Sequence, residues 1–186
     1  MSEISEYIDT VFKELKEVFA GVEEAEVDRF VDLVIQAERI FVVGAGRVGT
    51  SSRALAMRLV HLGKPTHWLQ DDTTPSNDQG DLIIANSGSG NTRSTYNYVL
   101  KAKERGTKVA TITANAEGKI AQVADSVIQL PAQTYNVDRS KWSSILPLGS
   151  QFELSLWVLH DFLTLRLVEK MGYTEEMMAK NHRLLE

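Results

Sequence analysis

Cysteine is absent from this chain of 186 residues, and proline is scarce, at 4 residues. Without cysteine there is neither a disulfide framework nor a thiolate metal site, as is common in a reducing compartment. No apolar run approaches the roughly 20 residues that a membrane-spanning helix needs. Residues 1–6 are acidic and lack the basic and apolar regions of a secretion signal. We therefore expect a cytoplasmic protein without a membrane partner.

Basic charge is also in deficit, because the formal net charge is −5 at pH 7. This charge opposes non-specific attraction to nucleic acid, so we expect no nucleic-acid partner. An anionic small molecule must instead be held by local donors. Apolar residues make up 43% of the chain, enough for one sizeable core, and the length favours a single domain over residues 1–186.

Hydrophobic periodicity predicts a layered α/β fold. Residues 1–37 are expected to form two N-terminal helices separated near Gly21, with Lys13, Glu14, Lys16 and Glu17 on a solvated face. Residues 38–147 alternate between helical segments and short apolar runs, which predict strands at 40–43, 66–69, 81–85, 108–113 and 126–130. This alternation predicts a three-layer α-β-α sandwich around a five-stranded parallel sheet, in the flavodoxin-like order 2-1-3-4-5.

Residues 148–186 are expected to form the C-terminal helices. The first, from Gly149 to about Met171, is apolar on more than one face, so we expect it to pack both on the sheet and on another subunit. A shorter helix is expected to begin at Thr174.

The most informative stretch follows the third expected strand and reads Asn-Ser-Gly-Ser-Gly-Asn-Thr at residues 86–92. Its glycines let the backbone turn tightly and approach a ligand. The hydroxyls of Ser87, Ser89 and Thr92 can donate to anionic oxygens, and the next helix directs unpaired N–H groups to the same point. The stretch favours a phosphate site. Judged by itself, it equally allows a Gly/Ser turn whose hydroxyls cap the helix.

A second glycine stretch, Gly-Ala-Gly-Arg-Val-Gly at residues 44–49, follows the first expected strand as a loop with Arg47 at its tip. With Asp71 or Asp72 about 20 residues further on, it fits a dinucleotide fingerprint. We favour a phosphosugar, because the chain lacks a second substrate-binding region and residues 86–92 supply a dedicated phosphate loop. In the expected sheet order, both glycine stretches meet at the carboxyl ends of neighbouring strands.

The Ser-x-Ser-Gly-x-Thr pattern of residues 87–92 resembles the phosphate loop of sugar isomerase (SIS) domains. Further stretches at residues 44–49, 56–63, 73–75 and 147–153 resemble the 6-phospho-3-hexuloisomerase branch of that family, and together they cover nearly the whole chain. The sequence departs at Gln70-Asp71-Asp72, where those isomerases usually carry Gly-Glu-Thr. Asp71 thus stands where a glutamate is expected.

The resemblance implies an aldose-ketose type isomerase that interconverts D-arabino-3-hexulose 6-phosphate and D-fructose 6-phosphate through a cis-enediol, with no metal and no cofactor. It implies a place in the ribulose monophosphate pathway of formaldehyde assimilation or detoxification, and a homo-oligomer, either a dimer or a tetramer. By the same resemblance, Glu153 moves the proton and His182 assists with oxygen protons, its tail able to reach a neighbouring subunit's site. The residues implied at the substrate are Gly46, Arg47 and Asp71 for the sugar and Ser87, Gly88, Ser89 and Thr92 for the phosphate.

Alternatives remain open at this stage. By spacing alone, Glu153 is a helix-start carboxylate stabilised by the helix dipole, and Arg47 is a surface arginine paired with an acid. The other histidines, His61, His67 and His160, are expected to be structural. Two rival functions are a SIS isomerase acting on a pentose or heptose phosphate and a non-catalytic phosphosugar-sensing module.

Overall fold

The computed structural model describes residues 2–135 and 143–182. The helices are α1 (Glu3–Ala20), α2 (Glu24–Gln36), α3 (Gly46–His61), α4 (Arg93–Glu104), α5 (Lys119–Val123), α6 (Ser150–Met171) and α7 (Glu175–Lys180). The strands are β1 (Ile40–Gly44), β2 (Thr66–Trp68), β3 (Leu82–Asn86), β4 (Lys108–Thr113) and β5 (Ser126–Gln129). A 3-10 turn, Pro147–Gly149, leads into α6.

The sheet is parallel throughout and has the order β2-β1-β3-β4-β5, which confirms the predicted fold class and strand order. In the register of β1 against β3, Gly44 lies opposite Asn86. The two glycine-rich stretches therefore begin at neighbouring carboxyl ends, as predicted.

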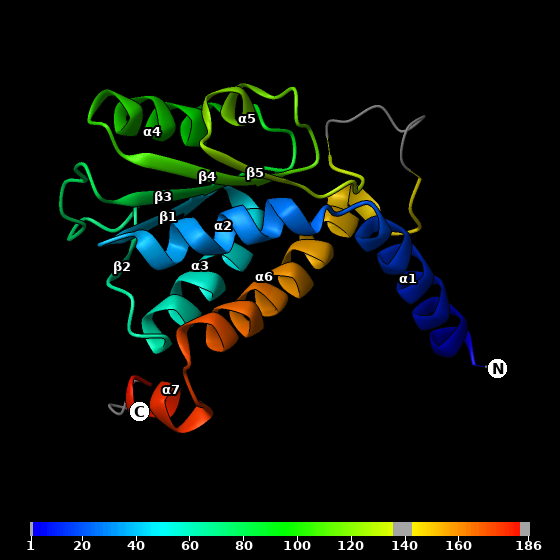
Figure 1. Cartoon of the computed structure of the whole chain (residues 1–186). Helices are drawn as coiled ribbons and strands as arrows, with labels where there is room; N and C mark the ends of the chain where they lie inside the picture. Colours follow the sequence, from blue (N-terminus) through cyan, green and yellow to red (C-terminus); the bar gives the residue numbers. More distant parts are fainter. Residues whose placement is uncertain (1, 136–142, 183–186) are drawn as a thin grey trace.

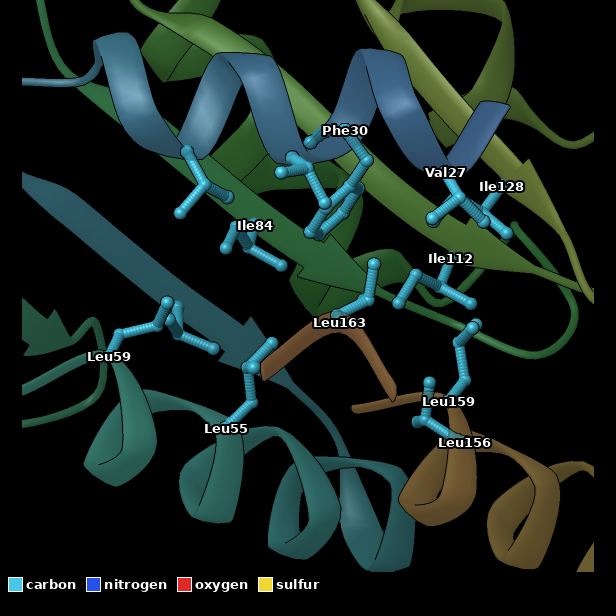
Figure 2. Close-up of a cluster of buried hydrophobic side chains, with 14 of the residues drawn as sticks. Val27, Phe30, Leu55, Leu59, Ile84, Ile112, Ile128, Leu156, Leu159 and Leu163 are labelled. Atoms are coloured by element: carbon cyan, nitrogen blue, oxygen red, sulfur yellow. The ribbon is translucent and has the colours of Figure 1, made fainter. Parts of the chain in front are cut away.

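Both faces of the sheet are covered by helices (Figure 1). Alternate strand residues such as Ile84 and Ile112 pack with α2, α3 and α6, and Figure 2 shows this larger cluster. The intervening residues, such as Phe41 and Ile83, pack with α4 and α5 on the opposite face. The strands are nearly continuous apolar runs because each is buried from both sides.

Helix α6 has two apolar faces, and among the described residues only one of them is buried. Leu156, Leu159 and Leu163 are buried against the sheet, whereas Trp157 and Phe162 are exposed. Packing on the sheet is thus confirmed, and the second face is available to another subunit. Within residues 2–135 and 143–182, the structure has no helix with the length and hydropathy to cross a bilayer.

The start of α3 corrects the expected loop at residues 44–49. The helix begins at Gly46, and Arg47 lies in its first turn rather than at a loop tip. Gly46 has a positive φ of 57°, which turns the chain directly from strand to helix. A Cβ on Gly49 would lie 2.6 Å from the carbonyl oxygen of Gly44, so helix and strand approach too closely for a longer connection.

The solvated face expected for α1 is also partly wrong. Glu14 is 9% exposed and accepts hydrogen bonds from residues near the start of α6. Its neighbours Lys13, Lys16 and Glu17 are exposed as predicted. The burial of Glu14 follows from the docking of α1, in which Val11 and Leu15 contact Leu146.

A buried polar network joins α3, β3 and α6 behind the carboxyl ends of the strands. His160 Nδ1 lies 3.1 Å from Ser51 Oγ and its Nε2 lies 3.2 Å from Asn86 Nδ2. Asn86 also donates to Ser52 Oγ at 3.0 Å and accepts from the N–H of Ile112 at 3.3 Å. The structural role predicted for His160 is confirmed, since both ring nitrogens have partners.

Burial lowers the pKa of His160 to about 3, against a smaller upward effect of the Ser51 hydrogen bond. In the unfolded chain this ring is protonated below about pH 6.5, whereas in the folded protein it stays neutral down to about pH 3. We expect the free energy of unfolding to be largest above about pH 6.5 and to fall toward pH 3, by up to about 1.4 kcal/mol per pH unit from this group.

The measurement is urea unfolding at several pH values, for the wild-type protein and for His160→Gln. The variant should show a shallower decline between about pH 6 and pH 4, because it lacks the titrating ring. Parallel curves for the two proteins would show that His160 does not carry this linkage.

Candidate active site

The loop between β3 and α4, residues 87–92, is held by its own carbonyl groups. Gly88 O accepts from Ala114 N at 3.0 Å and from Thr113 Oγ1 at 3.3 Å. Ser89 O accepts from Asn115 Nδ2 at 3.2 Å, and Gly90 O accepts from the N–H of Ile120 at 3.0 Å. Among the hydrogen bonds between described residues, none uses the N–H of Gly88 or Ser89. The loop is therefore anchored through its acceptors, and these two donors remain available to an anion.

Close backbone packing explains the glycines in this loop. A Cβ on Gly90, whose φ is 67°, would lie 3.0 Å from the Cα of Gly118. A Cβ on Gly88 would lie 2.7 Å from Thr134 Cγ2 and 3.1 Å from the ring of Phe152. The loop thus lies directly against the loops and helix that border the site.

The hydroxyl groups of the loop do not serve as ordinary helix caps. Thr92 occupies the N-cap position of α4 without a side-chain capping bond. Its hydroxyl instead lies 2.9 Å from Ser87 Oγ. Within the described part of the chain, Ser89 Oγ accepts only from the nearby N–H of Asn91, at 3.2 Å. The first N–H groups of α4 are therefore left for a ligand, as an anion site requires.

A cavity of about 190 Å³ opens beside this loop. Gly88, Ser89 and Thr92 line it on one side, and residues from three other segments complete it: Val48, Thr134, Tyr135, Leu148, Gly149, Phe152 and Glu153. None of these described lining residues is Lys or Arg. Val48 in the first turn of α3, Thr92 at the N-cap of α4 and Phe152 in the first turn of α6 all belong to the wall, so the positive ends of three helices border the cavity.

Glu153 lies in the first turn of α6 at the border between this cavity and a larger one. The larger cavity, of about 530 Å³, is lined by Tyr7, Arg47, Thr50, Leu146, Pro147, Ser150, Glu153, Leu154 and Trp157. Glu153 lines both cavities, and it is the one acidic residue among the described residues of the two linings. A ligand that spans the two cavities would therefore lie against its carboxylate.

Arg47 and Glu153 form an ion pair across 106 positions of sequence, with Arg47 Nε donating to Glu153 Oε2. The Glu153 side chain is 15% exposed and the Arg47 side chain is 74% exposed. The hydrogen bond to Glu153 raises the pKa of Arg47, so the guanidinium stays charged at the cavity border. The structure therefore joins two residues that the sequence placed at the sugar.

Asp71 does not join the ion pair of Arg47 and Glu153. It follows the edge strand β2, and its Oδ1 accepts from the N–H and hydroxyl of Thr73 at 2.9 and 2.8 Å. These two hydrogen bonds lower the pKa of Asp71. Among the described residues around the two cavities, neither Asp71 nor Gly46 appears in the lining.

His182 also lies away from Glu153 within one chain. Its ring lies 5.0 Å from the ring of His61, at the carboxyl end of α3. Arg47 is at the opposite end of that helix, about 21 Å along its axis. His182 therefore cannot serve Glu153 of the same subunit in this conformation, and residues 183–186 lie outside the described part.

Sequence reasoning missed several residues that border the cavities. Tyr7 comes from α1, which the sequence offered only as an amphipathic helix, and Thr134 comes from the polar segment after β5. The position of Thr134 just beyond a parallel strand was a usable signal, because such strand ends share one edge. Leu148 has an unusual φ of 52°, and no pattern in the sequence predicts this backbone conformation. Within the described part of the chain, no group of three or more His, Asp or Glu residues is arranged to hold a metal ion.

Known proteins support the same family and fold. The SIS domain family matches residues 33–149. A 3-hexulose-6-phosphate isomerase of Bacillus subtilis is 36% identical over 98% of this chain and 98% of its own length. Another, from Methylomonas aminofaciens, is 37% identical over 98% of this chain and 100% of its own length.

Solved structures agree. A Methanococcus jannaschii protein, whose crystal structure infers a molecular function of 3-hexulose-6-phosphate isomerase, superposes with a TM-score of 0.83 at 31% identity. That match covers 97% of this chain and 99% of the other. Since the family, near full-length relatives and the predicted sheet order all coincide, this chain belongs to the SIS domain family.

Proposed function

We propose that this protein is a sugar-phosphate isomerase that interconverts D-arabino-3-hexulose 6-phosphate and D-fructose 6-phosphate. The observation that carries the proposal is the position of Glu153, which borders both an anion-type cavity and a larger cavity and is paired with Arg47. The named isomerases of Bacillus subtilis and Methylomonas aminofaciens, alike over nearly the full length, support this choice of substrate.

The phosphate of the substrate would occupy the smaller cavity, where the hydroxyls of Ser89 and Thr92 and the N–H of Gly88 would donate to its oxygens. Ser87 is 2% exposed and does not line this cavity, so its hydroxyl, 2.9 Å from Thr92 Oγ1, would orient Thr92 from behind. A cavity of about 190 Å³ is filled by a phosphate and a few carbons, so a six-carbon chain must continue past Glu153 into the larger cavity. This arrangement supports an open-chain phosphosugar as the ligand.

The isomerisation needs one base that can move a proton between two adjacent carbons. Glu153 would remove the proton from C2 of the 3-ketose, giving an enediol across C2 and C3, and would return a proton to C3. The hydroxyl on C2 becomes the carbonyl of the product, and the former carbonyl oxygen on C3 takes up a proton. Arg47 would stabilise the negative oxygen of the intermediate, since a fixed charge there needs no reorganisation during the reaction.

The direct test is an assay for fructose 6-phosphate, formed from the hexulose phosphate and detected by a coupling enzyme. Product formation above the uncatalysed rate is the expected result. Saturable binding of the sugar phosphate without any turnover would contradict the proposal and favour a sensing module. Faster turnover of a pentose or heptose phosphate would change the substrate and leave the isomerase class in place.

We further propose that the protein is a cytoplasmic homo-oligomer, of the tetrameric kind, working in formaldehyde assimilation or detoxification. The exposed apolar face of α6, with Trp157 and Phe162, supports association, because an unpaired apolar face favours a partner. In such an assembly, His182 of one subunit would assist with oxygen protons at the site of another.

A subunit-mixing experiment tests that role of His182. Glu153→Gln and His182→Gln each should be nearly inactive, since each removes one proton-handling group. Mixed after dissociation and reassembled, they should regain part of the wild-type kcat, because some sites then combine an intact Glu153 with an intact His182. If the mixture stays as inactive as its components, or if His182→Gln alone keeps full activity, His182 has no part in a shared site.

A further inference from the structure

Glu14 on α1 is a buried carboxylate that the proposed reaction does not use. Its Oε1 accepts from the N–H of Ile145 at 2.9 Å. Its Oε2 accepts from the hydroxyl of Ser144 and from Gln151 Nε2, the latter at 3.2 Å. No Lys or Arg in the described part of the chain forms an ion pair with it. A carboxylate that is 9% exposed and has no cation depends on these three neutral donors.

The network around Glu14 extends to a third segment. Gln151 donates to Glu14 through its amide nitrogen and accepts through Oε1 from the N–H of Gln133, at 2.7 Å. The N–H of Phe152 donates back to Gln133 O at 3.2 Å. One carboxylate on α1 thus links residues 144–145, the first turn of α6 and the chain that follows β5.

These linked segments build the walls on both sides of Glu153. Leu146, Pro147 and Ser150 line the larger cavity, while Leu148 and Gly149 line the smaller one. Residues 148 and 149 both have positive φ, of 52° and 84°, and non-glycine residues seldom hold such a conformation without support. The contacts of Glu14 lie on both sides of this strained turn, at residues 144–145 and 151.

We propose that Glu14 is a positioning residue of the active site, which fixes the strained turn and the start of α6 so that Glu153 faces the substrate. This inference rests on the proposed isomerase function. Glu14 acts through Ser144, Ile145 and Gln151 and touches no reacting atom. The phosphate loop is anchored separately, by residues of β4 and the segment that follows it.

This separation gives Glu14 a signature that a general stabilising role does not have. If Glu14 only stabilised the fold, its loss would lower all activities together, in proportion to the unfolded fraction. If it positions Glu153, its loss lowers kcat in fully folded protein and weakens phosphate binding much less, because the donors to phosphate lie on the separately anchored loop.

The experiment compares Glu14→Gln with Glu17→Gln, an exposed glutamate one turn or less along the same helix. Glutamine places an N–H group where donors converge on the carboxylate. In folded protein we expect kcat to fall about 10- to 100-fold in Glu14→Gln, as a displacement near 1 Å can produce. The inhibition constant for inorganic phosphate should change much less than kcat, and Glu17→Gln should match the wild type in both measurements.

Ser144→Ala removes a single donor and serves as the second variant, decisive if Glu14→Gln does not fold. Its kcat should fall several-fold with phosphate inhibition unchanged. A folded Glu14→Gln with the kcat of Glu17→Gln would overturn the inference, as would a full kcat in Ser144→Ala when Glu14→Gln cannot be obtained. Equal losses in kcat and in phosphate binding would also overturn it. A wild-type protein without turnover is a different failure, that of the proposed function.

Discussion

Glu153→Gln is expected to retain substrate binding and to lose about 10²- to 10⁴-fold in kcat, which is what a positioned general base usually contributes. The amide keeps the size of the side chain and can still accept a hydrogen bond from Arg47, but it cannot remove a proton from carbon. Incorporation of solvent deuterium into the sugar phosphate should fall by the same factor, since exchange and isomerisation share the enediol.

Thermal stability separates this role from the alternative of a helix-start carboxylate. If Glu153 only stabilised the N-terminus of α6, glutamine would cost at most about 1 kcal/mol of stability and leave kcat near the wild-type value. Steady-state kinetics and the thermal midpoint of this one variant decide the matter. A well-folded variant with wild-type kcat would move the base to another residue.

The double variant Ser89→Ala, Thr92→Val is expected to raise KM strongly and to weaken competitive inhibition by inorganic phosphate. Each lost donor to a buried anion should cost about 1 to 3 kcal/mol, so the two together should weaken binding by about 30-fold or more. Because the change affects ground and transition states alike, kcat should fall much less than kcat/KM.

Ser94→Ala is the matched control, because Ser94 is exposed in the first turn of α4 and is not among the described residues that line either cavity. It should leave both constants unchanged. If the double variant binds phosphate as the control does, residues 87–92 form a turn and not an anion site.

The sequence was sufficient to predict the sheet and much less of what surrounds the site. The strands were visible because each is a short apolar run buried from both sides, and their predicted order made the stretches that begin at Gly44 and Asn86 neighbours, as the register confirms. Glu153 and Arg47 were expected at the same substrate site, but their ion pair was not predicted, since it joins residues far apart in the chain.

What escaped prediction depends on long-range packing. Glu14 looked solvated because Lys13, Lys16 and Glu17 beside it are, yet the docking of α1 buries one member of that charged run. The early start of α3 follows from the backbone approach of Gly49 to Gly44, which no spacing of residues reveals. His182 was expected at the site of its own or of a neighbouring subunit, and the docking of α7 on the far end of α3 places it away from the site of its own chain.

The N-terminal helices also set the order in which the chain can fold as it is made. Glu26 of α2 accepts from the N–H of Gln129 at 2.9 Å, a contact between residues 103 positions apart. At a synthesis rate of about 5 to 20 residues per second, roughly 5 to 20 seconds pass between the synthesis of Glu26 and that of Gln129. Glu14 waits longer still for residues 144–151. Helices α1 and α2 thus leave the ribosome well before the partners of Glu14 and Glu26 are made, and in that interval their apolar faces can meet other chains, and chaperones.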